Sequence, residues 1–261
     1  DAHIFCREDQ LADELTEVIK IFKQFYKDLG FDKYWMRLSL SDPKDKKYSV
    51  APRKDWERAE KALKKVLDDN KLEYKEAPGE AAFYGPKIDI QAVNVFGKED
   101  TISTIQFDFN LPRRFKLSYA DSQGKEIMPF VIHRALIGSF ERFFAFLIEH
   151  YAGAFPTWLA PVQAVILPIS DKNLEYAKKI EDRLLKEGLR VEVDSRSETL
   201  QAKIRDAQLK KVPYMLIVGA REEEKNAVAL RLRDGKNLGA ISIEEFISQS
   251  KRAIEEKLEL W

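Results

Sequence analysis

The apolar pattern of this chain changes character across a proline-rich segment, residues 153–161, and that change most constrains the fold. Before the segment, alternating apolar and polar residues are typical of strands in an antiparallel sheet. After it, strand-like apolar runs alternate with amphipathic helices, which indicates a small, mostly parallel sheet covered by helices. Two prolines stiffen the segment, so we expect it to link two domains.

The periodicity of apolar residues predicts the individual elements. Before the linking segment these are strands at residues 2–5, 35–40, 84–95, 101–109 and 128–133 and helices at residues 11–29, 54–70 and 135–151. After it they are strands at residues 162–169, 190–194, 214–218 and 227–232 and helices at residues 171–186, 198–211 and 242–258. The helix at residues 135–151 is apolar on nearly all sides, so we expect it to be buried.

Charge and cysteine content exclude several classes of protein. Lys plus Arg equals Asp plus Glu, at 44 each, so contact with nucleic acid must come from local patches and not from net charge. A single cysteine, Cys6, excludes an internal disulfide framework and suits the cytoplasm. No apolar run approaches the ~20 residues that span a bilayer. The first residues read as the middle of a strand, so we expect a fragment of a longer protein.

The run from Pro129 to Arg142 contains several residues that can bind a metal ion or a phosphate. A strand-like stretch delivers His133, a Gly138-Ser139 break follows, and an aromatic helix presents Arg142. A metal-capable imidazole, a floor of small residues and a fixed cation suit a site for a metal and a nucleotide phosphate. The alternative is a buried strand that enters a buried helix, with the arginine paired to a nearby glutamate.

A second histidine, His3, also lies in a short strand pattern, on the same face as Phe5. If its strand neighbours that of His133, both imidazoles could reach one metal ion. Zinc sites need a third protein ligand. Cys6 is a poor candidate, because a residue three positions along a strand faces away. The alternative is two unrelated core histidines.

The run at residues 129–142 resembles motif 3 of class II aminoacyl-tRNA synthetases, and in detail that of the threonyl-tRNA synthetases. Further matches to this family cover the whole chain, at residues 1–6, 82–88, 104–109, 155–161 and 212–216. The resemblance implies an α+β fold. It consists of a partial catalytic domain with an antiparallel sheet at residues 1–155, a linker at 156–161, and a small α/β anticodon-binding domain with a mixed sheet at 162–261.

The resemblance implies an enzyme that activates threonine with ATP and transfers it to tRNA(Thr), as a homodimer and with magnesium accompanying ATP. In that family zinc is held by two histidines, which match His3 and His133, and by a cysteine that lies upstream of this chain. The zinc binds the amino group and hydroxyl of threonine, and Asp1 matches a carboxylate beside it. For Asp1, the alternative is a chain-end residue without a role.

The resemblance also assigns roles in substrate binding. Tyr84 would line the amino-acid pocket, Gln106 would lie in the active-site floor, and Lys87 would supply positive charge near the reacting phosphate or the tRNA end. Gly138, Ser139 and Arg142 would bind ATP. The alternatives are a hairpin entry at residues 82–87 and a solvent-facing glutamine on an alternating strand.

In the second part, Glu222 and Arg231 match family positions that contact anticodon bases, and a third position, asparagine in other members, is Ser197 here. Further cations are candidates for RNA contact, although charged helices are most often solvated faces. They are Arg196, Lys203, Arg205, Lys210, Lys211, Arg221 and Arg233.

Several parts of the family's site are absent from this sequence, namely motif 1, the motif 2 arginine, an adenine-stacking aromatic and the zinc cysteine. We therefore expect the chain alone to be inactive and the intact protein to be a threonine–tRNA ligase. The rival hypothesis is a non-catalytic RNA-binding or accessory protein built on a class II synthetase scaffold.

Overall fold

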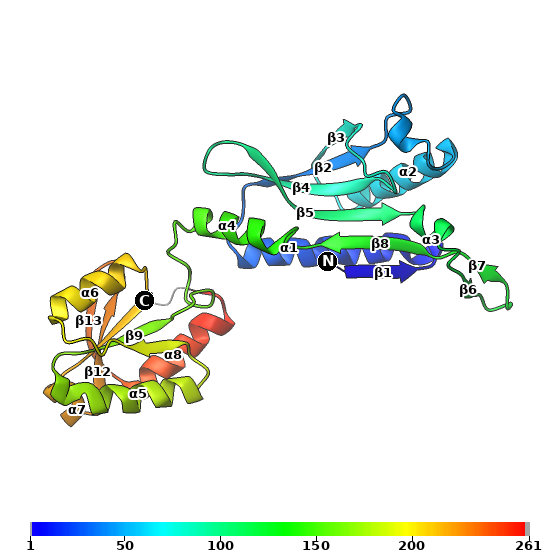
Figure 1. The fold of residues 1–261 in the computed structure, drawn as a ribbon. Helices are drawn as coiled ribbons and strands as arrows, with labels where there is room; N and C mark the ends of the chain where they lie inside the picture. Colours follow the sequence, from blue (N-terminus) through cyan, green and yellow to red (C-terminus); the bar gives the residue numbers. More distant parts are fainter. Residues whose placement is uncertain (1, 259–261) are drawn as a thin grey trace. The chain divides into compact units, whose positions relative to one another are not determined.

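One sheet organises the first unit of the molecule, Asp1–Leu147 (Figure 1). The computed structural model describes residues 2–258. The strand order is β1-β8-β5-β4-β2-β3, and neighbours are antiparallel except β2 and β3. The strands are β1 (Ala2–Cys6), β2 (Tyr34–Leu40), β3 (Tyr74–Pro78), β4 (Lys87–Val93), β5 (Glu99–Asp108) and β8 (Phe130–Ala135). The predicted antiparallel sheet is confirmed, with one parallel edge strand added.

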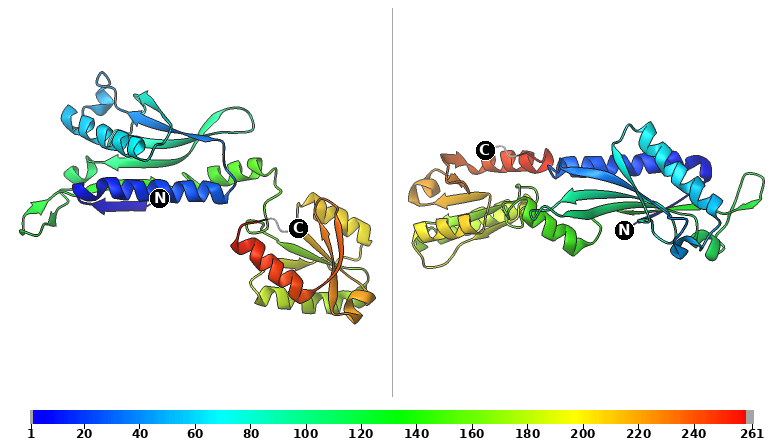
Figure 2. Two further views of the ribbon diagram at one scale, coloured as in Figure 1. Left: turned by 180° about the vertical axis from the view of Figure 1, so that it is seen from behind. Right: turned by 90° about the horizontal axis from the view of Figure 1, so that it is seen from above.

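Two amphipathic helices, α1 (Leu11–Asp28) and α2 (Arg53–Asp69), cover one face of this sheet, and Figure 2 shows them along the same side. Alternation along the strands turns Leu38, Ile88 and Ile105 toward the helices, and all three are fully buried. Complete burial stabilises the fold by about 1.5–3 kcal/mol for each such side chain. The opposite face of the same strands is therefore left to polar side chains.

The helix predicted at residues 135–151 is wrong in its start and in its burial. Strand β8 continues to Ala135 because that residue still pairs with Thr104 of β5. Helix α4 spans Phe140–His150, and its aromatic residues are partly exposed, with Phe140 71% and Phe144 47% accessible. When a helix is apolar on all sides, its sequence does not predict which side packs against the rest of the protein.

Several short elements are absent from the sequence prediction. Strand β3 reads Tyr-Lys-Glu-Ala-Pro and has no run of residues that favour strands. A two-stranded hairpin projects beside the start of β8 in Figure 1. The other elements of this unit are η1 (Glu8–Gln10), η2 (Lys46–Tyr48), α3 (Leu111–Arg114), β6 (Tyr119–Ala120) and β7 (Glu126–Ile127).

The second unit, Ile148–Trp261, contains a mixed sheet in the order β10-β9-β11-β12-β13. Strands β10, β9 and β11 are parallel, while β12 and β13 add an antiparallel hairpin, so the sheet is mixed and not mostly parallel. Its strands are β9 (Ala164–Pro168), β10 (Val191–Val193), β11 (Tyr214–Val218), β12 (Ala227–Leu232) and β13 (Asn237–Ser242). Its helices are η3 (Asp171–Asn173), α5 (Leu174–Lys186), α6 (Leu200–Leu209), α7 (Ala220–Glu224) and α8 (Ile243–Glu255).

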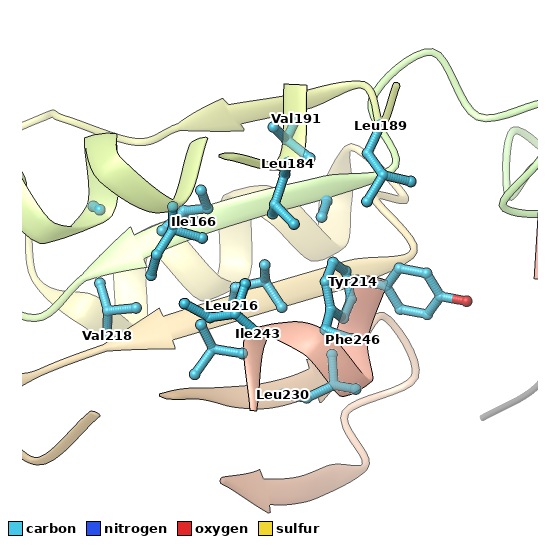
Figure 3. Packing of buried hydrophobic residues seen from close by; sticks show 14 of the residues in the cluster. Ile166, Leu184, Leu189, Val191, Tyr214, Leu216, Val218, Leu230, Ile243 and Phe246 are labelled. Atoms are coloured by element: carbon cyan, nitrogen blue, oxygen red, sulfur yellow. The ribbon is translucent and has the colours of Figure 1, made fainter. Parts of the chain in front are cut away.

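Helices cover both faces of this second sheet. On one side α5 and α8 pack against Ile166 and Leu216, with Phe246 at the centre of the cluster (Figure 3). On the other side α6 packs against Val165 and Met215. Alternate residues of one strand thus enter two separate cores, which explains why these strands read as continuous apolar runs.

The segment predicted as a linker is bonded to the second unit. The Thr157 hydroxyl donates to the Tyr214 hydroxyl at 2.9 Å, and Arg190 donates to the carbonyl oxygens of Trp158 and Ala160 at 2.9 and 3.0 Å. Among the helices within residues 2–258, none combines the length and apolar character needed to cross a membrane.

Candidate functional site

A single row of residues crosses the polar face of the first sheet. Strand register places Ser39 opposite Lys87, Lys87 opposite Gln106, Gln106 opposite His133, and His133 opposite His3. Directly opposite residues of antiparallel strands project on the same face with Cβ atoms about 4.5–5.5 Å apart. The row therefore brings together four of the residues singled out in the sequence, from β4, β5, β8 and β1.

Tyr84 lies over this row. Its hydroxyl donates to Oε1 of Gln106, and its ring centroid lies 5.4 Å from that of His133. Burial, followed by the charge of Asp108, raises the pKa of the Tyr84 phenol, although the Gln106 hydrogen bond opposes the increase. A Cβ at Gly85 would stand 1.8 Å from the Phe107 carbonyl oxygen, so only glycine lets residues 84–86 approach β5 this closely.

The two imidazoles form one cluster, as expected if their strands are neighbours. The ring centroids of His3 and His133 are 4.5 Å apart with an interplanar angle of 80°. Nε2 of His133 lies 2.8 Å from Oδ2 of the fully buried Asp108, which orients the ring. Within residues 2–258 no group of three or more His, Cys, Asp or Glu side chains is arranged to hold a metal. Asp1 lies outside the described residues.

Cys6 does not complete this cluster. Its side chain is 6% exposed, on the opposite face of β1 from the exposed His3. Burial raises the pKa of the thiol to about 11, and Glu14 and Asp9 add to the increase. Metals bind the thiolate, so a cysteine in this environment is a poor ligand, as its position in the strand predicts.

A charged cluster continues the polar face one step along the strands. Asp89 is fully buried, two residues from Lys87 on β4, and accepts hydrogen bonds from Lys87, Arg37, Ser39 and Thr104. Burial alone would raise the pKa of the Asp89 carboxyl, but the charge of Lys87 and the hydrogen bonds hold it below its usual value. Asp89 and Asp108 are absent from the sequence prediction; the signal that could have found them is their position two residues from Lys87 and Gln106.

Arg142 stands apart from the other charges. It is exposed in the first turn of α4 and has no hydrogen bond or ion pair within residues 2–258, so the glutamate pair considered in the sequence does not form. Gly138, with φ +60°, precedes it in the turn, and a Cβ there would lie 2.9 Å from the Ile102 carbonyl oxygen. Gly138 and Ser139 are exposed, so the backbone beside Arg142 is open to a ligand.

In the second unit the three predicted base-contacting residues occupy three different elements. Ser197 is exposed in the loop before α6, and the Glu222 carboxylate accepts from the Gly219 N–H at 3.0 Å at the start of α7. Arg231, on β12 opposite Met215, is half-buried, and its buried Nε has no hydrogen-bond partner in the region that the structure describes. No hydrogen bond or ion pair joins these three side chains in the described part of the chain.

Some of the cations proposed for RNA contact are engaged inside the protein. Lys203 is 4% exposed and donates to the carbonyl oxygens of Pro168 and Asp194 at 3.3 and 3.1 Å, so its assignment as an RNA contact is wrong. Arg196 bridges Asp194 and Asp206 at 2.7 and 2.8 Å. An amphipathic pattern cannot tell a buried lysine such as Lys203, or an exposed arginine paired like Arg196, from a free cation. Lys210, Lys211 and Arg221 remain exposed.

These features define a class of protein: an antiparallel sheet with a polar row and a motif 3 turn, followed by a small mixed α/β domain. A family model of the tRNA synthetase class II core domain (G, H, P, S and T) matches residues 1–151, and one of the anticodon binding domain matches residues 163–252. The chain belongs to this family of class II tRNA synthetases.

Within the family, the chain is similar to proteins specific for threonine. It is 48% identical over 258 residues to the threonine–tRNA ligase of Oceanobacillus iheyensis, which covers 98% of this chain and 40% of the relative. It is 48% identical over 251 residues to threonine–tRNA ligase 1 of Bacillus subtilis, covering 96% and 39%. The crystal structure of the RNA binding domain of threonyl-tRNA synthetase from Cryptosporidium parvum superimposes with a TM-score of 0.88 at 38% identity, covering 96% of this chain and 62% of that one. The chain thus spans about 40% of the length of these curated relatives.

Proposed function

We propose that the protein to which this chain belongs is a threonine–tRNA ligase, which activates threonine with ATP and transfers it to the 3′ end of tRNA(Thr). The observation that carries the proposal is the row formed by Lys87, Gln106, His133 and His3 across one face of a class II sheet. Residues 1–155 would form part of the catalytic domain, 156–161 the linker, and 162–261 the anticodon-binding domain. The complete enzyme would act as a homodimer in the cytoplasm.

Arg142 would bind the nucleotide. Its guanidinium has no protein partner in the described residues and is planar, always charged and a multiple donor, so it suits an adenine face and a γ-phosphate together. Gly138 and Ser139 leave room for the nucleotide beside it. Lys87 would neutralise charge at the reacting phosphate, and magnesium would accompany ATP. Positioning and charge neutralisation would supply the rate enhancement, without a protein nucleophile.

The amino acid would bind between Tyr84 and Gln106, close to the histidine pair, and the family resemblance assigns the carboxylate of Asp1 to the same ligand. His3 and His133 fit two ligand positions of a zinc site, because both imidazoles project from paired strands on the same face. A cysteine outside this chain would supply the third. When bound, zinc would hold the amino and hydroxyl groups of threonine. A site that binds the hydroxyl disfavours valine by about 10⁴-fold or more.

The second unit would read the anticodon through Ser197, Glu222 and Arg231. Single-stranded bases are recognised by hydrogen bonds and stacking on groups that are already placed. The unpartnered Nε of Arg231 supports this role, because it leaves a buried donor to be satisfied.

Threonine-dependent exchange between ATP and pyrophosphate, measured on the complete protein, tests the proposal. We expect exchange with threonine, almost none with valine, and aminoacylation of tRNA(Thr). Lys87→Ala should abolish most of the exchange while tRNA binding persists. Binding of tRNA without exchange in the unaltered complete protein would instead favour the non-catalytic RNA-binding or accessory protein.

Metal analysis tests the zinc proposal separately. The complete protein should retain zinc after dialysis against a mild chelator, and His133→Asn should lose it. Cys6→Ser is the control, since the thiol lies on the other face of β1. Loss of zinc from Cys6→Ser, or its retention in His133→Asn, would contradict the assigned ligands.

A further inference from the structure

The fully buried Asp89 carboxylate is the most heavily bonded group on the polar face of the first sheet. Its Oδ2 atom accepts from Nζ of Lys87 at 2.6 Å, from Oγ of Ser39 at 2.8 Å and from Nη2 of Arg37 at 3.0 Å. Its Oδ1 atom accepts from Oγ1 of Thr104 at 2.9 Å. Three neighbouring strands, β2, β4 and β5, therefore supply donors to one side chain.

The two cations of this cluster share a single oxygen atom. Lys87 and Arg37 both lie within hydrogen-bond distance of Oδ2, so the carboxylate separates two positive charges that would otherwise face each other. Arg37 has little else to hold it there. Its other ion pair, with the exposed Glu80, is 3.9 Å long, and its buried Nε has no hydrogen-bond partner among residues 2–258.

Lys87 links this cluster to the candidate active site. Its side chain is 17% exposed, it stands opposite Gln106 in the ladder, and it lies two residues from Asp89 on the same face of β4. A lysine on four methylenes has many rotamers, and fixing one of them costs up to ~2 kcal/mol of side-chain entropy. The bond to Asp89 selects the rotamer that keeps Nζ on the polar face of the sheet.

We propose that Asp89 is a positioning residue for the activation reaction, which holds the Lys87 ammonium beside Gln106 and shields it from Arg37. This inference rests on the proposed function, which assigns Lys87 to the reacting phosphate. Replacing the carboxylate with an amide leaves two cations near a neutral group. Lys87 then turns away from Arg37, and the charge needed at the phosphate is displaced although Lys87 is still present.

Kinetics of threonine-dependent ATP–pyrophosphate exchange on the complete protein test the inference. Asp89→Asn should lower kcat by about 10–100-fold, the range observed when a supporting partner of an active-site group is removed. The KM for threonine should change little, because the hydrogen bonds of Asp89 go to Lys87 and to Arg37, Ser39 and Thr104, and none of them goes to Tyr84 or Gln106. Thr104→Val is the matched control: it removes a neutral hydrogen bond to the same carboxylate and should leave kcat within a few-fold of the unaltered protein.

The double variant Arg37→Gln with Asp89→Asn separates positioning from folding. It removes the opposed cation, so it should fold as well as the unaltered protein, yet Lys87 still lacks its anchor and kcat should stay about 10-fold low. If Asp89→Asn alone does not fold, this variant carries the test. An unaltered kcat in whichever of the two variants folds would overturn the positioning role.

Lys87→Ala distinguishes the failure of this inference from the failure of the proposed function. A large loss of exchange in Lys87→Ala together with an unaltered kcat in Asp89→Asn would overturn the inference alone. An unaltered rate in Lys87→Ala would remove Lys87 from the reaction and overturn both the assigned role of that residue and the inference built on it.

Discussion

The two sheets of this chain use their faces differently. In the first unit α1 and α2 cover one face, and the other carries a row of polar side chains set by strand register. In the second unit helices cover both faces, so the polar candidates lie in a loop, in a short helix and on a strand near the edge. A face left free of apolar packing can hold a connected site, whereas a sheet buried on both sides must place its contacts at its margins.

This difference has an energetic counterpart. Residues of the first site share strand ladders and hydrogen bonds, as Tyr84 and Gln106 do, so their substitutions should be strongly non-additive. No hydrogen bond or ion pair joins Ser197, Glu222 and Arg231 within residues 2–258, and their substitutions should add almost independently.

The largest expected effect tests whether the units are energetically independent. Phe246→Ala removes a fully buried ring between α8 and the second sheet and should lower the free energy of unfolding of that unit by about 3–5 kcal/mol. Hydrogen exchange followed by peptide should show faster exchange across residues 162–258 and no change in residues 2–147. The exposed Ser248→Ala on the same helix serves as the control. Destabilisation that spread to the first unit would break the comparison.

The next largest effect tests the proposed contact between Arg142 and the nucleotide. Arg142→Ala in the complete protein should lower the rate of threonyl-adenylate formation by about 10²–10³-fold, because a placed charge contact is lost. Affinity for tRNA(Thr) should not change. Arg114 is exposed and its side chain has no hydrogen bond or ion pair within residues 2–258, so Arg114→Ala should be neutral in both assays. An equal loss in the two arginine variants would show a general charge effect and not a nucleotide contact.

A smaller, selective effect is expected at the second site. Arg231→Ala should weaken binding of tRNA(Thr) by about 1–3 kcal/mol and should not affect a tRNA with an altered anticodon. Lys172→Ala, on the exposed start of η3, should change little. Equal weakening for both RNAs would identify a phosphate contact, and no weakening for either would end the proposed role.

The smallest effect depends on pH. The hydrogen bond from Arg196 is the main cause that holds the pKa of Asp194 below its usual 3.8. A carboxyl group whose pKa is lowered by folding stabilises the folded state at pH values above its usual pKa. This stabilisation is lost as the pH falls through the pKa of the folded state. Arg196→Ala should therefore lower the free energy of unfolding slightly near pH 7, because solvent screens an exposed ion pair, and by less near pH 2. Urea unfolding at both pH values checks this. Arg221→Ala is the control, because the Arg221 side chain has no ion pair within residues 2–258. An equal loss of stability at both pH values would exclude the ion pair as the cause.

The sequence predicts the elements whose periodicity is continuous. Leu15, Ile19, Phe22 and Tyr26 repeat at helical spacing, and all four are buried in α1. Strands β11 and β12 occur at the predicted residues, 214–218 and 227–232. Strand β13 escapes prediction, because Gly239, at φ +81°, interrupts a run of only six residues.

The sequence predicted only those residues of the candidate site that lie in recognisable family motifs. The sequence left open whether the strands of His3 and His133 are neighbours, and the structure pairs the two residues directly. The position of Asp89 two residues from Lys87 was visible in the sequence, but its other partners were not. Arg37 and Ser39 come from a strand about 50 positions earlier in the chain, a separation that spacing rules do not cover. The burial and the partners of Asp89 exist only once β2 has paired with β4.

A β-bulge in the β4–β5 ladder limits where residues can be inserted into or deleted from this part of the chain. Ile90 pairs with Ser103 and Gln91 with Thr101, which leaves Ile102 as an extra residue in β5. Beyond it the hairpin turn at residues 94–98 can gain or lose residues without turning Lys87 or Gln106 to the other face. An insertion between Ser103 and Gln106 would invert the row, since a shift of one residue exchanges the two faces of a strand. Among homologues, we therefore expect length differences to collect in the hairpin and none in the four positions that follow the bulge.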